Sequence, residues 1–320
     1  MSPVKQKGKT SALVEITATV QHIEKNQSFY RVRFRDLNGK SRTTLIPREA
    51  FRMPTKVCDL LLQAHADIPT NGRDGTQIIV DAEKQRANHK VRLTSRTGWH
   101  GKAFVLPRKT FGGKKANRLK FDNSQMINPA LGKQDGKLEI WRKGLREACE
   151  LSDYVLFGIA VAFAAPLLHM TNSDEGVVFH LHGGSSITKN ESIKNKSSNG
   201  KTLTARVAAS TLGRCRKSDL MTFAASSRGI EDLCFAHNNL LLVLDEEGRI
   251  PHTLAAGRAA VSEIAYAVPS GRGKIRSNRA TRDKDLQNLS WCLFAISTGE
   301  NPLDGRANSQ REEGEQVRMI

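Results

Sequence analysis

Apolar and polar residues alternate along residues 12 to 47, which is the pattern of a β-sheet with one buried face. Asn38 and Gly39 interrupt this alternation and favour the tight turn of a β-hairpin. Downstream, VCDLLLQAHAD has a helical pattern, and the short run TQIIVDA predicts one more strand. These elements predict a small α+β domain over residues 11–88, preceded by a basic tail over residues 1–10.

The pattern changes in the remainder of the chain, residues 89–320. Residues 137 to 170 predict two helices, and three short apolar runs follow at 177–183, 239–248 and 289–298. Short apolar runs separated by helical stretches are typical of a parallel sheet that helices cover on both faces. We therefore expect an α/β domain of this kind after the N-terminal α+β domain.

The overall charge points to a polyanionic partner. Lysine and arginine total 50 against 32 aspartates and glutamates, which gives a formal net charge of +18. Such a surplus favours nucleic acid over a neutral metabolite. The five cysteines are scattered, without a CxxC pair, so neither a disulfide framework nor a zinc site is predicted, and a reducing cytoplasm is the expected compartment.

Neither the N-terminus nor the most apolar segment of the chain predicts export or a membrane role. The N-terminus is basic but lacks the apolar stretch of a signal peptide. The most apolar segment, residues 154 to 170, is shorter than a typical span and contains Gly158, Pro166 and His169. We expect it to be a buried core helix.

A candidate phosphate-binding loop follows the first apolar run of the second domain. A strand, a glycine-rich loop and a helix succeed one another here, which is the context of a P-loop. Lys201 would neutralise the β- and γ-phosphates of ATP, and the Thr202 hydroxyl would help to hold Mg²⁺. The predicted cradle consists of Gly183, Gly184, Ser185, Ser186, Asn199, Gly200, Lys201 and Thr202.

Twelve residues, 187–198, separate the two halves of this loop. Without them the loop reads GGSSNGKT, a complete GxxxxGKT motif. Three interpretations stay open. The cradle can be local, from Asn195 to Thr202; the twelve residues can bulge out while the two halves close the loop, since a longer loop costs little free energy; or the GKT tripeptide can occur by chance.

Two later segments complete the candidate site. The apolar run that begins at Leu240 ends in Asp245 and Glu246; there Asp245 would bind Mg²⁺ and Glu246 would orient and deprotonate the attacking water. The alternative is a solvated strand end. The third apolar run ends in Ser297 and Thr298, where a polar side chain can sense the γ-phosphate.

A basic, glycine-rich stretch over residues 270–279 contains Arg276. Such a stretch suits nucleic-acid phosphates or an arginine finger that reaches a neighbouring subunit. A solvated basic loop is the alternative interpretation.

Several segments together resemble domain-of-unknown-function family 927, which occurs in helicases and primase-helicases of phages, plasmids and integrated elements. They are, in chain order, GWHGKAFVLP, FAAPLLHM, FHLHGGSS with NGKTLTARVAAS, AHNNLLLVLDE, GRGKIRS and FAISTGE. The resemblance spans roughly residues 20 to 320. It implies a P-loop ATPase of the AAA+/helicase type, with ATP and Mg²⁺ as cofactors and a DNA-related role in a mobile element.

The resemblance also implies roles for individual residues. By motif, Lys201 and Thr202 take the Walker A positions, Asp245 and Glu246 the Walker B positions, and Thr298 or Ser297 a sensor position. Arg318, in the closing GEQVRMI, resembles a second sensor or an arginine finger. Because the chain stops there, we expect a C-terminal continuation to be missing.

The sequence therefore predicts an ATP-hydrolysing motor that acts on nucleic acid, with single-stranded DNA as the expected partner. If motors of this type assemble as homo-oligomeric rings, Arg276, Arg279 or Arg318 would act across the subunit boundary. Two alternatives follow from the interruption at residues 187–198. One is a nucleic-acid-binding protein without catalysis, and the other is a regulatory protein that binds ATP without turning it over.

Overall fold

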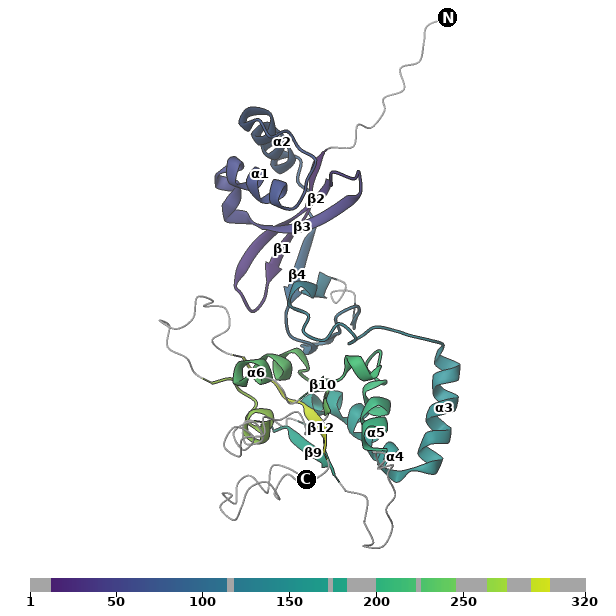
Figure 1. The fold of residues 1–320 in the computed structure, drawn as a ribbon. Coiled ribbons are helices and arrows are strands. Elements are labelled where there is room, and N and C mark those ends of the chain that lie inside the picture. The colour runs from purple at the N-terminus through teal and green to yellow at the C-terminus, as the bar shows by residue number, and fades with distance from the viewer. Residues whose placement is uncertain are drawn as a thin grey trace, which may run out of the picture. The chain divides into compact units, whose positions relative to one another are not determined.

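The computed structural model describes residues 13–113, 118–171, 175–182, 200–222, 226–245, 264–274 and 289–299. The chain divides into two compact units, with the boundary between Thr94 and Ser95. Both units mix helices and strands (Figure 1).

The first unit combines antiparallel strands with two helices. Its elements are β1 (Val14–His22), β2 (Gln27–Arg35), β3 (Ser41–Pro47), the 3-10 helix η1 (Arg48–Arg52), α1 (Pro54–Gln63), α2 (Gly72–Lys84) and β4 (Lys90–Thr94). The four strands lie in the order β3-β2-β1-β4, with antiparallel pairs except for the parallel pair of β1 and β4. The predicted turn joins β2 to β3, and Gly39 adopts the left-handed backbone conformation that it requires, with a φ of 72°.

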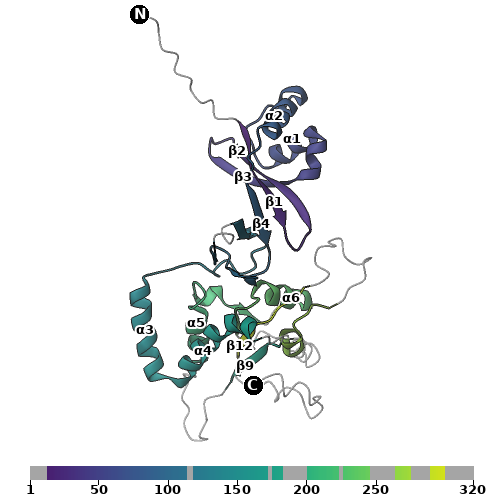
Figure 2. The same cartoon turned by 180° about the vertical axis from the view of Figure 1, so that it is seen from behind.

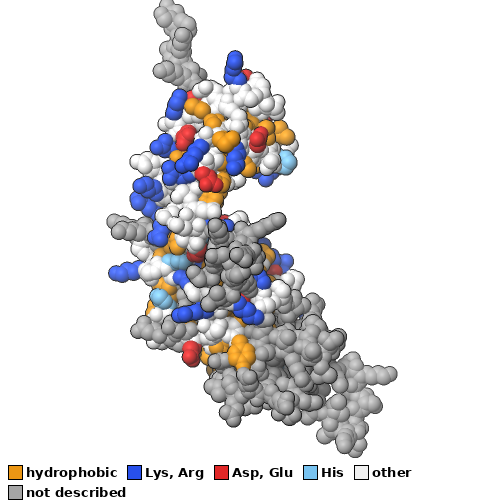
Figure 3. Space-filling model, turned by 90° about the vertical axis from the view of Figure 1, so that its left-hand side faces the viewer, with side chains coloured by type: hydrophobic (Ala, Val, Ile, Leu, Met, Phe, Trp, Pro, Cys, Tyr) orange, Lys and Arg blue, Asp and Glu red, His pale blue; other side chains and the backbone are white. Residues whose placement is uncertain are grey.

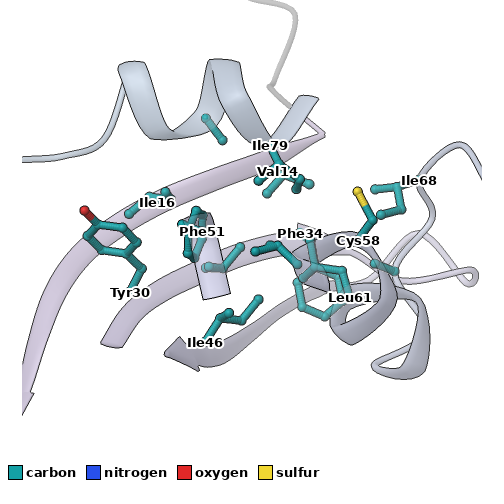
Figure 4. Packing of buried hydrophobic residues seen from close by; sticks show 14 of the residues in the cluster. Val14, Ile16, Tyr30, Phe34, Ile46, Phe51, Cys58, Leu61, Ile68 and Ile79 are labelled. Atoms are coloured by element: carbon teal, nitrogen blue, oxygen red, sulfur yellow. The ribbon is translucent and has the colours of Figure 1, made fainter. Parts of the chain in front are cut away.

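The core of the first unit lies between its sheet and its helices. Figure 4 shows side chains of β1, β2 and β3 meeting those of η1, α1 and α2. Tyr30 packs its ring edge-on against Phe51, with 4.9 Å between the ring centroids. Leu61 and Ile79 bring the two helices into the same cluster and are fully buried. The helices therefore cover the apolar face that the alternating pattern predicts.

The prediction of a strand at TQIIVDA is wrong, because these residues belong to α2. Consecutive apolar residues such as Ile78 and Ile79 fit a buried strand and a helix equally well. The helix begins before that run, at Gly72, and its N-cap is Asn71, whose side chain accepts a hydrogen bond of 3.0 Å from the backbone N–H of Asp74. The helical spacing of the buried Gly75, Ile79 and Ala82 then turns one face to the core.

Replacing Asn71 by alanine is expected to destabilise the first unit by about 1 kcal/mol, because α2 loses its N-cap. Asn71→Ser keeps a side-chain oxygen that can accept the same bond, so this variant should stay within a few tenths of a kcal/mol of the parent. Urea unfolding of the full chain, followed by circular dichroism, measures both variants. Equal stability of the alanine variant and the parent would contradict the assignment of the cap.

In its described residues, the second unit has a three-stranded antiparallel sheet and a four-stranded sheet. Its elements are β5 (Gly98–His100), β6 (Ala103–Val105), β7 (Thr110–Phe111), β8 (Leu119–Phe121), η3 (Asn123–Gln125), α3 (Leu138–Leu151), α4 (Asp153–Ala164), η4 (Ala165–Met170), β9 (Val177–Leu181), α5 (Lys201–Ala209), η5 (Lys217–Asp219), β10 (Met221–Thr222), α6 (Ser227–Ala236), β11 (Leu241–Asp245) and β12 (Phe294–Thr298). The antiparallel sheet consists of β5, β6 and β7.

All strand pairs of the four-stranded sheet are parallel, and the order is β10-β11-β12-β9. The three predicted apolar runs supply β9, β11 and β12, whereas the two-residue β10 has no counterpart in the sequence-based prediction. β12 and β9 are neighbours in the sheet although they are far apart in the chain. Figures 1 and 2 show α4 and α5 on one side of β9 and β12, and α6 on the other.

Helices cover both faces of this sheet, as the continuous apolar runs predict. On one face, Leu241, Val243 and Ile296 pack against α4 and α5. On the other, Leu242 and Leu244 pack against α6 and the helical residues 264–270. Adjacent residues of a strand point to opposite faces. The strands are therefore apolar throughout because both of their faces are buried.

The segment predicted as a buried core helix is buried on one face only. Val161 and Ala162 of α4 pack towards the sheet, whereas Tyr154 and Phe163 are 71% and 55% exposed. Residues Asp153–Met170 are long and apolar enough to cross a bilayer by length and composition, and 39% of this segment is buried within the unit. A single such segment is weak evidence for a membrane role, since domain helices meet the same criteria.

Candidate nucleotide-binding site

Three parallel strands of the second unit end at one edge of their sheet. β9 ends at Leu181, β11 at Asp245 and β12 at Thr298. The pairing register places Thr298 beside Leu181 and Ser297 beside Leu244, so the three carboxyl ends are level. In open parallel sheets this edge is where ligands bind.

The alternation of side chains decides which face each terminal residue takes. Asp245 follows Leu241 and Val243 at intervals of two, so it lies on the face that α5 covers. Thr298 follows Ile296 in the same way and lies on the same face. The two strand ends therefore present a carboxylate and a hydroxyl towards α5.

Asp245 accepts two hydroxyl hydrogen bonds at this position. The Thr202 hydroxyl at the start of α5 donates to Asp245 Oδ1 over 3.0 Å. The Thr298 hydroxyl donates to the same oxygen over 2.6 Å. Asp245 and Thr298 are each only 3% exposed. The structure thus brings together Thr202 of the predicted loop, Asp245 of the acidic strand and Thr298 of the sensor position.

The N-terminus of α5 lies at this cluster through Thr202. Gly200 precedes the helix in the left-handed conformation, with a φ of 77°, and its carbonyl accepts the first helical bond, from Thr204, at 2.8 Å. Lys201 is the first helical residue. The first backbone N–H groups of a helix lack intrahelical acceptors, and the helix dipole adds positive potential there. Together with the Lys201 ammonium they favour an anion such as phosphate.

The structure separates the two alternatives for the sensor position. Ser297 lies on the opposite face from Thr298, and its hydroxyl pairs with Nδ1 of His180 over 2.7 Å. Because Asp245 lies on the α5 face, only Thr298 of the two reaches it. Ser297 instead links β12 to β9.

Some predicted site residues lie outside the described part of the chain. These are Gly183, Gly184, Ser185, Ser186, Asn199, Glu246, Arg276 and Arg318, together with residues 187–198. Their roles stay predictions from the sequence.

Sequence reasoning missed a buried polar cluster that fixes the start of β11. The Asn238 side chain donates to the Thr97 carbonyl over 2.9 Å and accepts from the Cys292 backbone N–H over 3.0 Å. The adjacent Asn239 accepts from the Trp99 backbone N–H over 3.1 Å. The sequence signal that could have indicated this cluster is the pair Asn238 and Asn239 at the start of an apolar run. Through these bonds the segments before β11 and β12 are held in register, which positions Asp245 and Thr298.

The oxygen donors of the site fit a magnesium ion. The described residues hold no cluster of three or more His, Cys, Asp or Glu side chains that would bind a metal by themselves. Mg²⁺ is usually held by one or two carboxylates, with water and substrate phosphates completing its shell. The Asp245 carboxylate and the Thr202 hydroxyl match this requirement.

Comparisons with known proteins bear on the fold. The profile of a family described as Domain of unknown function (DUF927) matches residues 4–288. A solved structure described as "SCCmec type IV Cch - active helicase" has a TM-score of 0.65 and 16% sequence identity, covering 96% of this chain and 53% of that one. This chain therefore spans about half the length of that helicase. At this identity the likeness concerns the fold alone.

A second solved structure, described as the apo A form of the NrS-1 C-terminal region, is a much weaker match. Its TM-score is 0.35 at 10% identity, with 95% of this chain and 62% of that one covered. No curated protein matches this chain.

Proposed function

This chain belongs to the DUF927 family, and we propose that it is a Mg²⁺-dependent ATPase of the helicase type that acts on nucleic acid. One observation carries the proposal: hydroxyls from the start of α5 and from the end of β12 meet on the buried carboxylate at the end of β11. A P-loop ATPase needs a lysine, a hydroxyl and a carboxylate around one phosphate site, and Lys201, Thr202 and Asp245 supply them.

Each side chain has a distinct task in this proposal. The Lys201 ammonium and the N-terminal N–H groups of α5 bind the terminal phosphates. Thr202 and Asp245 would hold Mg²⁺ through their oxygen atoms, and the ion would supply positive charge against the phosphates. The hydroxyl of Thr298 holds the Asp245 carboxylate in place over 2.6 Å. Glu246 is proposed, from the sequence, to orient and deprotonate the attacking water.

The proposed partner is nucleic acid, with single-stranded DNA as the first substrate to test. The formal net charge of +18 favours a polyanion. Figure 3 shows Lys and Arg side chains spread over the visible face of the first unit. The similar fold of a protein described as an active helicase supports this choice. We further propose a homo-oligomeric ring in which Arg276 or Arg318 completes the neighbouring site.

Steady-state ATP hydrolysis tests the proposed function. We expect the intact chain to hydrolyse ATP with Mg²⁺ and to do so faster with single-stranded DNA. A version that lacks residues 187–198 has the uninterrupted GGSSNGKT loop and is the matched comparison. Hydrolysis by neither version would refute the ATPase. Activity in the shortened version alone would favour the rival function, a catalytically impaired binding protein.

A further inference from the structure

A cavity of about 530 Å³ opens beside the C-terminal end of α5, whereas the candidate nucleotide site lies at its N-terminal end. Its walls are the loop of residues 132–137, the first turn of α3, the end of α5 and the loop of residues 210–216. At about 1.5 Å per residue, the nine residues of α5 separate the two places by about 13 Å. The volume is within the range of about 300–1,000 Å³ that small-ligand sites occupy.

Cationic side chains dominate the lining of this cavity. The cations are Lys133, Lys137, Arg206, Arg214 and Arg216, and Asp135 is the one carboxylate among the described residues of the lining.

Hydrogen bonds fix the arginines among these cations. Arg214 forms a fork with Asp219 over 2.8 and 2.6 Å, and Arg216 donates to Asp135 over 3.1 Å. Arg206 donates through Nε to the Cys215 carbonyl over 3.0 Å, which fixes the guanidinium at the wall. Among the described lining residues, one carboxylate, Asp135, faces five cations, and Asp219 pairs with Arg214 from outside the lining, so the cavity is suited to an anion.

An aromatic side chain lies in the same wall. The indole of Trp141 lines the cavity, and its Nε1 donates to the Ser210 hydroxyl over 2.9 Å. This bond ties the start of α3 to the end of α5. Leu106, Leu138 and Leu212 add apolar surface next to it. A flat aromatic ring beside several cations matches the two halves of a nucleotide, which are a planar base and a phosphate.

We propose that this cavity binds one nucleotide unit of a single-stranded nucleic acid, with the base against Trp141 and the phosphates at Lys133, Lys137 and Arg206. The choice of a strand as the source of the nucleotide rests on the proposed function. A chain with few aromatic residues can still hold a strand in this way, because one ring stacks one base while the cations follow the backbone.

Binding of a fluorescein-labelled dT oligonucleotide to the full chain tests this site by anisotropy. Trp141→Ala should weaken binding about 5- to 150-fold, the range expected for the loss of one stacked base. Trp141→Phe keeps a ring and should retain most of the affinity. Intrinsic fluorescence should be quenched by unlabelled dT oligonucleotide in the parent, and this quenching should be smaller in Trp141→Phe.

Salt dependence tests the cations of the cavity. Lys133→Ala and Arg206→Ala should each reduce the slope of log K against log salt by about 0.7, the value for one phosphate contact of a single strand. The matched control is Lys143→Ala on α3, which removes the same charge from a side chain that is 81% exposed and outside the cavity. This control should change the slope less than either cavity variant does.

Two results would overturn the proposal. The first is oligonucleotide binding by Trp141→Ala and Lys133→Ala that equals binding by Lys143→Ala. The second is Trp141-dependent quenching by free ATP or dTMP without quenching by the oligonucleotide, which would make the cavity a site for free nucleotides. A failure of the proposed ATPase activity can be distinguished from a failure of the proposed strand site. A chain without hydrolysis whose oligonucleotide binding still depends on Trp141 would refute the motor and keep the strand site.

Discussion

Replacing Lys201 by alanine is expected to reduce ATP hydrolysis by at least about 100-fold, the usual cost of removing one well-placed group that stabilises transition-state charge. Lys201 is the first residue of α5, and its neighbour Thr202 donates to Asp245. The change removes the ammonium without disturbing that hydrogen bond. Phosphate release from saturating ATP and Mg²⁺ is the measurement.

The control for this variant is Lys143→Ala, which loses the same charge from an exposed position on α3. Both variants should unfold at the temperature of the parent, because neither lysine belongs to the buried core. Hydrolysis by Lys201→Ala at the rate of the control would show that α5 does not carry the phosphate site.

Asp245→Asn is expected to reduce hydrolysis by about 100-fold or more while leaving the fold intact. A metal ion contributes several kcal/mol to such a reaction, and each ~1.4 kcal/mol corresponds to a tenfold change in rate. Asparagine keeps an oxygen that can accept from Thr202 and Thr298, and it removes a buried charge. We expect an unchanged or raised melting temperature without nucleotide, and loss of the stabilisation that ATP and Mg²⁺ give the parent.

Asp219 serves as the comparison for Asp245, because its carboxylate forms an ion pair with Arg214 within the fold. Its hydrogen bonds with Arg214 hold the pKa of the Asp219 carboxyl below its usual value. A carboxyl of lowered pKa stabilises the fold above its unfolded pKa, and this stabilisation is lost as the pH falls through the folded pKa. Asp219→Asn should therefore lower the melting temperature at neutral pH, whereas Asp245→Asn should not. A fall of similar size in both variants would contradict a metal-binding role for Asp245.

Local signals in the sequence predicted much of the fold. The Asn38-Gly39 turn was predictable because its backbone conformation is encoded by two adjacent residues. The helix α2 was not, because its apolar run fits two periods and the cap at Asn71 lies before that run. The single buried face of α4 also escaped prediction, since a segment that is apolar all round does not indicate which side packs.

The candidate site was predictable by residue type and order, but its geometry required the sheet. Thr202, Asp245 and Thr298 are widely separated in the sequence and meet because three parallel strands end level with one another. The face that α5 covers distinguishes Thr298 from Ser297, since neighbouring residues in a strand point to opposite faces. The cavity at Trp141 has no sequence signal, because it is assembled from residues 132–141 and 206–216.

Equilibrium binding of ATP to the intact chain, with Mg²⁺ and then with an excess of chelator, shows whether Lys201, Thr202 and Asp245 form one site for a nucleotide and its metal. Binding, unlike hydrolysis, does not depend on the proposed catalytic role of Glu246, which lies outside the described residues. We predict that ATP binds with Mg²⁺, that the chelator weakens this binding, and that Asp245→Asn removes the difference. ATP affinity that is the same with Mg²⁺, with chelator and in Asp245→Asn would rule out a metal-dependent nucleotide site at these residues.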